Sequence, residues 1–387
     1  MIKTTLRWLV LLVALALAAT SLLMVFKAPV WLDWRLRMLI GMLVGECGLW
    51  FALLPLSFGT AAWLMRRGRP ALAATTLGVC AVAFVLMLKP TAQAWWLARA
   101  MPAQLAAAFG PAALERAPFS LAACFARAPE RVTVKTMKYT DLLKLDFYHA
   151  VGRSPAPCIM ALHGGAWYLG DRKESRAIQQ SNRWLAQHGY AVASIDYRLV
   201  PQAIWPAQRN DVLAAIAFLR ERATELEIDP ARIVLLGRSA GGQLAEAVAY
   251  AAHDSGICGV IALYAPADMK LGWDSSSTTD SFNQRQILQQ FLGGTPTTAR
   301  DAYESSSGAL LVSPGAPPTL LLHGQLDTIV PDGQSELMAR KLAAVGVPHT
   351  LILLPWATHG FDYINFDSPG AQITTYAMEW FLSVVTR

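Results

Sequence analysis

Residues 237–241, Gly-Arg-Ser-Ala-Gly, separate an apolar run at 232–236 from a helix-like run at 243–249. This order predicts a strand, a sharp turn with Ser239 at its apex, and a helix. Glycine on both sides of the serine allows a turn that is too tight for side chains. The N-terminus of the following helix stabilises negative charge beside the hydroxyl. The alternative is an ordinary strand-to-helix turn in which the serine only caps the helix.

Strand and helix patterns alternate through residues 131–387. Strand patterns lie at 132–134, 145–148, 158–162, 191–195, 260–264, 319–322 and 350–354, and helix patterns at 207–225, 332–345 and 370–385. This alternation predicts an α/β fold in which helices cover both faces of a mostly parallel sheet. Residues 267–316 interrupt the rhythm with Ser, Thr, Gly and Pro and one helix pattern at 283–292. We expect an insertion there that forms a lid or a pocket wall over the active-site end of the sheet.

A loop with two glycines, His-Gly-Gly-Ala-Trp at 163–167, follows one of the expected strands. Backbone N–H groups on such a loop point at a carbonyl oxygen as it becomes an oxyanion. The loop resembles the oxyanion loop of lipases and esterases, and this resemblance implies that Gly165 and Ala166 supply two of these groups, with Ala240 as their partner. The loop positions expected to support them, rather than to act as a base, are His163 and Gly164.

An aspartate and a histidine downstream complete a nucleophilic constellation. Asp327 follows the strand pattern 319–322, and His359 lies in the loop after the last strand pattern. His359 would take the proton of Ser239, and Asp327 would orient the imidazole and stabilise its charged form. The chain order Ser, Asp, His is the one expected on this kind of sheet. Asp327 could also be a turn residue, and Asp332 is a rival that capping of the next helix explains.

The first 90 residues hold most of the long apolar runs of a chain that is 54% hydrophobic and 16% charged. The runs at 8–26, 47–65 and 71–88 predict an N-terminal bundle of two to three transmembrane helices. A cleaved signal peptide is the competing interpretation of the first run, because Ala16-Leu17-Ala18 resembles a cleavage site. The run continues to Phe26, which favours an uncleaved span.

Basic residues around these runs predict the orientation. The Arg-rich loop 66–69 should stay cytoplasmic, which, with three spans, places the N-terminus in the cytoplasm and the catalytic domain outside it, in the periplasm of a bacterium. Lys27, Arg35 and Arg37 lie in another loop and argue for the reverse.

The remaining features of the sequence are less specific. Residues 91–130 are either a linker or a short helix, at 105–116, that lies on the bilayer or caps the site. The net charge of +6 forms no Arg/Lys stripe in the globular part, so no nucleic-acid partner is expected. Five cysteines lack metal-ligand spacing and are interpreted as unpaired buried thiols. We expect no metal and no organic cofactor, and the sequence leaves the oligomeric state open.

Residues 131–387 resemble an α/β-hydrolase of the esterase/lipase group that carries a His-Gly-Gly oxyanion loop. The stretch 163–171 is similar to the acyl-esterase branch near feruloyl esterases and kynurenine formamidases, and to membrane-bound prenylcysteine methylesterases. Residues 196–199 and 205–208 fit the same group, where they brace the region beneath the site. Ala166 stands where the hormone-sensitive-lipase branch has a third glycine.

Together these motifs predict a membrane-anchored serine ester hydrolase that forms an acyl-enzyme with small or medium acyl esters, or with lipid-like ones. Trp167 and Tyr168 either line the substrate pocket or only pack. An amidase, a formamidase or an acyltransferase would use the same triad. A catalytically silent, membrane-tethered binding protein is the alternative from another class.

Overall fold

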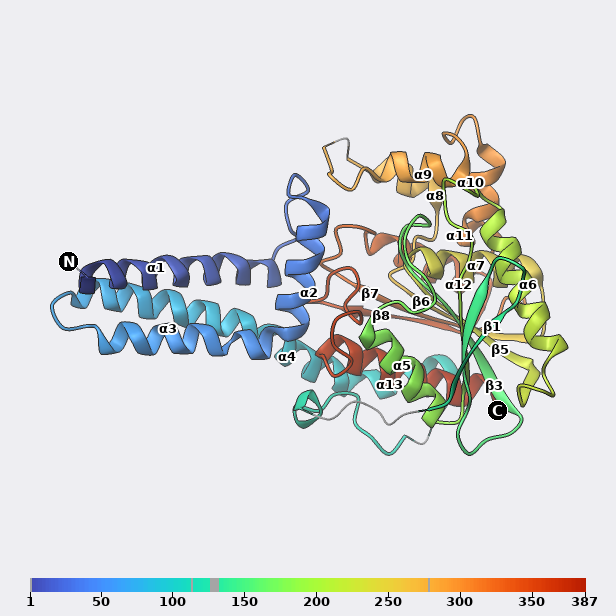
Figure 1. Ribbon diagram of the computed structural model, residues 1–387, viewed down its shortest axis with the longest axis horizontal. Helices are drawn as coiled ribbons and strands as arrows, with labels where there is room; N and C mark the ends of the chain where they lie inside the picture. The colour runs from blue at the N-terminus through green and yellow to red at the C-terminus, as the bar shows by residue number, and fades with distance from the viewer. Residues whose placement is uncertain (1, 113, 126–131, 278) are drawn as a thin grey trace.

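The computed structural model describes residues 2–112, 114–125, 132–277 and 279–387. It has two parts: four N-terminal helices, which form an elongated arm, and an α/β domain at the end of that arm (Figure 1). The N-terminal helices are α1 (Ile2–Ser21), α2 (Trp34–Phe51), α3 (Leu53–Leu64) and α4 (Pro70–Phe109).

The α/β domain contains one eight-stranded sheet of order β1-β2-β4-β3-β5-β6-β7-β8. Strands β3 to β8 run parallel, and only β1 and β2 are antiparallel to their neighbours. The mostly parallel sheet expected from the sequence is therefore confirmed. The strands are β1 (Val134–Lys138), β2 (Lys144–Tyr148), β3 (Ala156–Leu162), β4 (Ala191–Ile195), β5 (Ile228–Arg238), β6 (Ile257–Leu263), β7 (Thr319–Gly324) and β8 (His349–Leu354).

Helices cover both faces of the sheet, as expected. The covering helices are α5 (Arg176–Gln187), α6 (Ala207–Glu221), α7 (Ala240–Ala252), α12 (Gly333–Ala344) and α13 (Pro369–Val385). Successive residues of a strand point to opposite faces, and β5 shows the result: Leu235 belongs to the core that includes Leu244 of α7, whereas Val234 and Leu236 belong to the core that includes Ile373 of α13. Strands β3, β4 and β7 are buried on both faces, which fixes their register.

The insertion expected at 267–316 is present and contains more helix than the one segment anticipated. It is built from α8 (Met269–Ser275), α9 (Gln284–Leu292), α10 (Arg300–Ser306) and α11 (Gly308–Leu311). Side chains from α8 and α9 line a pocket at Ser239, so the insertion forms a pocket wall at this end of the sheet.

Two of the N-terminal helices, α1 and α4, are long and apolar enough to cross a membrane, and the bent pair of α2 and α3 would raise the number to three. The expected span 47–65 is not one straight helix, because the chain bends by 55° between α2 and α3. Residues 47–51 belong to α2, which crosses between the helical arm and the α/β domain (Figure 1).

Helix α4 corrects two expectations. The helix that contains the expected span 71–88 does not end at Lys89-Pro90, because α4 continues through Pro90 and Pro102 to Phe109. Its second half is buried beside α13, with Met101 and Leu105 in the core, and the side chain of Gln104 donates to the Leu351 carbonyl at 2.9 Å. This packing outweighs the helix-breaking tendency of proline. Of the two alternatives for 91–130, a separate short helix at 105–116 is not present: residues 105–109 are the end of α4, residues 110–112 and 114–116 are not helical, and residue 113 lies outside the described residues.

Helix α2 is attached to the α/β domain by polar contacts. The Glu46 carboxylate is buried and accepts hydrogen bonds from the Trp356 indole at 3.2 Å and from the Gly370 amide at 2.8 Å. Buried Arg37 forms an ion pair with Asp280 of the insertion. Removing one partner of a buried ion pair lowers the stability of a protein by several kcal/mol. These contacts therefore hold α2 in a defined position against the domain.

We expect Gly48→Ala to destabilise the protein and Gly78→Ala to leave it unchanged or slightly more stable. A Cβ at Gly48 of α2 would lie 2.5 Å from the Met87 carbonyl oxygen of α4, whereas a Cβ at Gly78 meets no atom within 4 Å. Both changes raise helix propensity by roughly 0.5–1 kcal/mol. The difference in stability between the two variants therefore reports the contact between Gly48 and Met87. Thermal melting of the full chain in detergent measures it, and equal melting temperatures would contradict a close α2–α4 packing.

Candidate active site

The turn that carries Ser239 has no room for a side chain at the positions two residues before and two residues after the serine. Ser239 lies between β5 and α7 with a φ of 52°, which L-residues rarely adopt. A Cβ at Gly237 would lie 2.1 Å from the Gly241 carbonyl oxygen, and a Cβ at Gly241 would lie 2.1 Å from the Leu162 carbonyl oxygen of β3. The two glycines therefore permit the close approach of α7 to β3 that presents the serine.

Ser239, His359 and Asp327 form one line of hydrogen bonds. His359 Nε2 lies 2.9 Å from Ser239 Oγ, and His359 Nδ1 lies 2.7 Å from Asp327 Oδ2. With the His359 proton on Nδ1, the imidazole donates to the carboxylate and accepts from the serine hydroxyl. The structure thus brings the three expected residues together in the arrangement that a nucleophile, a base and an orienting acid require.

The Asp327 carboxylate is buried and well satisfied. Its Oδ1 accepts from the amides of Ile329 and Val330 at 2.8 and 2.9 Å. Burial raises the pKa of Asp327, but the adjacent imidazoles of His359 and His323 outweigh burial and hold this pKa well below its ordinary value. The carboxylate is therefore ionised at neutral pH. His323, whose Nε2 is 3.3 Å from Oδ2, was missed by the sequence analysis although it stands four residues before Asp327.

The loop 163–167 follows β3 and bends sharply at Gly165 (φ 117°) and Ala166 (φ 49°). Only glycine fits at Gly165, since a Cβ there would lie 2.0 Å from the Leu169 carbonyl oxygen. Ala166 adopts a left-handed backbone conformation although it carries a side chain. Within the described residues, no hydrogen bond uses the amides of Gly165, Ala166 or Ala240, which leaves all three free for a ligand oxygen.

His163 supports this loop from below and makes no contact with the serine. Its buried ring stacks on Tyr197 at a centroid distance of 4.1 Å, and the Tyr197 hydroxyl donates to the His163 carbonyl at 2.8 Å. These contacts fit the supporting role expected for His163 and for the segment 196–199. Gly164 packs against the serine turn, since a Cβ there would be 3.3 Å from the Arg238 carbonyl oxygen.

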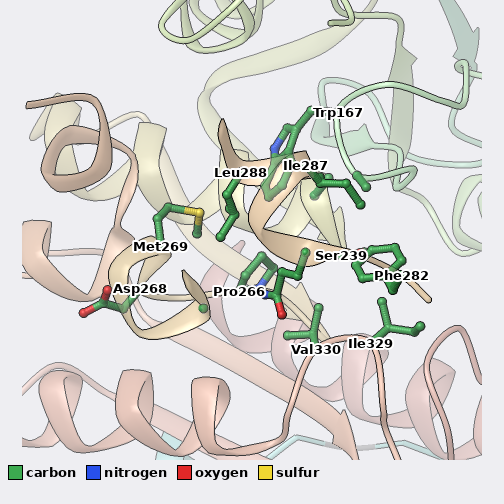
Figure 2. A pocket seen from close by; sticks show the side chains of 14 residues that line it. Trp167, Ser239, Pro266, Asp268, Met269, Phe282, Ile287, Leu288, Ile329 and Val330 are labelled. Carbon is green, nitrogen blue, oxygen red and sulfur yellow. The ribbon is translucent and has the colours of Figure 1, made fainter. Parts of the chain in front are cut away.

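Two pockets meet at Ser239. The inner pocket, of about 20 Å³, is lined by Trp167, Met269, Ile287, Leu288 and Val330 (Figure 2). The outer cavity, of about 240 Å³, is lined by Trp34, Met38, Tyr168, His359 and Tyr363. Both pockets border Ala166, Phe282 and Ile329.

The two aromatic residues expected at the pocket are both present there, with different burial. Trp167 is buried, stacks on Phe291 at 4.1 Å and donates from its indole N–H to Gln243 Oε1 at 2.9 Å. It therefore packs and lines the inner pocket at the same time. Tyr168 is half-buried and lines the outer cavity.

A buried charged network lies behind the histidine, and the sequence analysis did not anticipate it. Arg238 Nε donates to Asp362 Oδ2 at 2.6 Å, and the Tyr264 hydroxyl donates to Asp362 Oδ1 at 2.6 Å. The Tyr264 ring meets His359 edge-on at a centroid distance of 4.7 Å. The carboxylate of Glu174 lies 3.9 Å from Arg238. Arg238 belongs to the serine motif itself. Its partners Asp362 and Glu174 lie in distant loops, and no local sequence pattern links these loops to the motif.

Asp332 is not a capping residue. It precedes α12 as expected, but its side chain makes no capping hydrogen bond. Instead its carboxylate pairs at 3.2 Å with Lys27, from the segment between α1 and α2. The pair leaves Asp327 as the aspartate that reaches His359.

Comparisons with known proteins identify the family of the chain. The family model BD-FAE matches residues 145–342, just over half of the chain. The chain therefore belongs to the BD-FAE family.

Curated relatives carry names of ester hydrolases. Esterase LipC of Mycobacterium tuberculosis is 32% identical over 253 residues, which are 60% of this chain and 59% of the relative. A probable isoprenylcysteine alpha-carbonyl methylesterase of Oryza sativa is 28% identical over 54% of this chain and 52% of its own length. The chain thus spans between half and three fifths of these relatives.

Solved structures show the same fold. A truncated carbohydrate esterase from gut microbiota superimposes with a TM-score of 0.57 at 24% identity, over 67% of this chain and all of the other. Butyrate-bound esterase Est2 of Thermogutta terrifontis gives a TM-score of 0.53 at 24% identity, over 64% of this chain and 93% of the other. The domain has the α/β-hydrolase fold.

We expect wild-type stability to fall between pH 5 and 7 more steeply than that of Glu174→Gln. Burial raises the pKa of Glu174 to about 7 from an ordinary value of 4.5, although the charge of Arg238 opposes the shift. Between pH 5 and 7 the carboxyl of Glu174 is ionised in the unfolded chain but still protonated in the folded one. The free energy of unfolding therefore decreases by on the order of 1–3 kcal/mol as the pH rises. The glutamine variant lacks this loss.

Thermal melting at half-unit pH steps measures the difference, which corresponds to a few degrees. Glu221→Gln, at an exposed position on α6, is the matched control and should follow the wild type. Parallel pH profiles for the wild type and Glu174→Gln would contradict the raised pKa.

Proposed function

We propose that this protein is a membrane-anchored serine ester hydrolase. The observation that carries the proposal is the line of hydrogen bonds from Ser239 through His359 to Asp327, next to three free backbone amides. Membership in the BD-FAE family and the names of the relatives support carboxylic esters as the substrate class. The described residues contain no group of side chains that could hold a metal ion, and the proposed steps need none.

The proposed reaction passes through an acyl-enzyme. Ser239 Oγ attacks the ester carbonyl carbon while its proton moves to His359 Nε2. The amides of Gly165, Ala166 and Ala240 donate to the developing oxyanion. The intermediate then expels the alcohol, which takes the proton from His359. Water, deprotonated by His359, attacks the acyl-enzyme, and the carboxylic acid leaves as the proton returns to Ser239.

Hydrolysis of p-nitrophenyl esters from acetyl to palmitoyl tests this function. We expect wild-type turnover that Ser239→Ala lowers by at least about 10³-fold and Asp327→Asn lowers by about 10³–10⁴-fold, because neither variant retains the complete relay. Melting temperatures within a few degrees of the wild type would show that both variants are folded. Equal, slow hydrolysis by all three proteins would refute the proposal and favour a catalytically silent binding protein.

The membrane anchor is the second element of the proposal. Helix α1 is about 30 Å long at 1.5 Å per residue, which matches the hydrocarbon thickness of a bilayer. Arg7 donates to the Met65 carbonyl at 3.0 Å, so the basic loop 66–69 lies at the same end of the arm as the start of α1. This end is remote from the α/β domain (Figure 1).

This distribution of charge supports a domain outside the cytoplasm. Basic residues at the remote end favour a cytoplasmic location for that end. Three basic residues, Lys27, Arg35 and Arg37, argue for the reverse. Two of them, Lys27 and Arg37, pair with Asp332 and Asp280 of the domain, which gives these two a structural reason. We propose that the domain is extracytoplasmic.

A phosphatase reporter that is active only outside the cytoplasm, fused to the C-terminus in a bacterial host, tests the orientation. We expect reporter activity comparable to that of a secreted control. Replacement of Arg66, Arg67 and Arg69 by Asn should lower the active fraction severalfold, because these residues retain the loop in the cytoplasm. An inactive reporter on a fusion protein that is present in the membrane fraction would reverse the proposed orientation.

A further inference from the structure

The two pockets at Ser239 differ in their relation to His359. The outer cavity includes His359 among its lining residues, whereas the inner pocket does not. In the proposed reaction the alcohol oxygen must lie within hydrogen-bond reach of His359 Nε2 to receive its proton. The alcohol part of an ester therefore extends into the outer cavity. The acyl part lies on the other side of the carbonyl carbon and therefore occupies the inner pocket.

The sizes of the two pockets set which esters fit. A cavity must offer a volume of about 10–15 Å³ to hold one water molecule. The inner pocket, of about 20 Å³, therefore holds a group the size of one or two waters. Trp167, Met269 and Leu288 close it around the serine (Figure 2), and all three side chains are buried. An acetyl group fits, and a long acyl chain does not. The outer cavity, of about 240 Å³, accommodates a much larger group.

The N-terminal arm supplies one wall of the outer cavity. Trp34 and Met38 of α2 line it together with Phe282 of the insertion, and the Trp34 ring meets the Phe282 ring edge-on at 5.3 Å. Buried Arg37, between these two α2 residues, is paired with Asp280, and the Ser281 hydroxyl donates to the Leu32 carbonyl at 2.9 Å. These contacts fix the α2 wall next to the insertion, so the cavity is complete only when the arm is present.

Two large aromatic side chains that precede this wall in the chain are exposed. Phe26 and Trp31, in the connection from α1 to α2, are 62% and 75% exposed. Large aromatic residues with this exposure are typical of the membrane–water interface. An apolar alcohol dissolved in the bilayer would reach the cavity along this side.

We propose that the site hydrolyses esters that combine a short acyl group with a long apolar alcohol, and that Trp34 and Met38 of α2 recognise the alcohol. This inference rests on the proposed ester hydrolase function and adds the substrate class. The Ser239 Oγ–acyl bond forms as the bond to the alcohol oxygen breaks, the alcohol leaves with the proton from His359, and water releases the short acid.

Two isomeric esters test the inference. Decyl acetate and methyl undecanoate have the same atoms and nearly the same hydrophobicity, but the long chain lies on opposite sides of the ester. Acid release by the full chain in detergent micelles gives kcat/KM for each. We expect at least a tenfold preference for decyl acetate, because only the outer cavity has room for the long chain.

Three variants separate the pockets. Trp34→Ala should lower kcat/KM for decyl acetate at least fivefold by removing part of the alcohol wall, and Met38→Ala should act in the same direction. Leu288→Ala should raise kcat/KM for methyl undecanoate at least fivefold by enlarging the inner pocket. Trp96→Ala, at an exposed position of α4 that lines neither pocket, should leave the preference unchanged. Melting temperatures establish that each variant is folded.

The outcomes distinguish this inference from the proposed function. Hydrolysis that depends on Ser239 but favours methyl undecanoate, or a preference that neither Trp34→Ala nor Leu288→Ala changes, would overturn the inference and leave the ester hydrolase intact. Absence of acid release from both esters and from p-nitrophenyl acetate, with a folded wild type, would overturn the function itself.

Discussion

The contact on which the site depends is the approach of the start of α7 to the end of β3, where Gly241 meets the Leu162 carbonyl. It forces Ser239 into its unusual backbone conformation and places the serine beside the loop that continues from β3. The same contact therefore positions the nucleophile and the free amides relative to each other. Strained residues persist only where the surrounding structure holds them, and here the two-sided core of the parallel sheet provides that support.

The sequence predicted the elements whose signals are local. The serine turn, the 163–167 loop and the loops of Asp327 and His359 each follow a short apolar strand, and parallel strands bring their carboxyl ends to one edge of a sheet. Strand patterns alone therefore suggested that these residues lie together. The line of hydrogen bonds observed between them has the arrangement that this reasoning anticipates.

The features that the sequence missed depend on tertiary packing. Pro90 signals a helix end locally, but the burial of the second half of α4 against the domain outweighs that signal. The break at Ala52 lies inside a continuous apolar run and follows from the docking of α2, in which Glu46 bonds to the domain. The network of Arg238 and Asp362 joins residues 124 positions apart. No periodic pattern encodes such pairings.

Helix α4 has a mechanical consequence for the proposed anchored state. It contains 40 residues and is about 60 Å long, and it runs from the helical arm into the hydrophobic core of the catalytic domain (Figure 1). A continuous helix resists bending far more than a flexible tether does. In the proposed anchored state, α4 would therefore restrict the tumbling of the domain and hold Ser239 at a nearly constant height over the lipid surface. The length of the proposed anchor would thus determine how deep in the membrane an ester bond must lie to be cleaved.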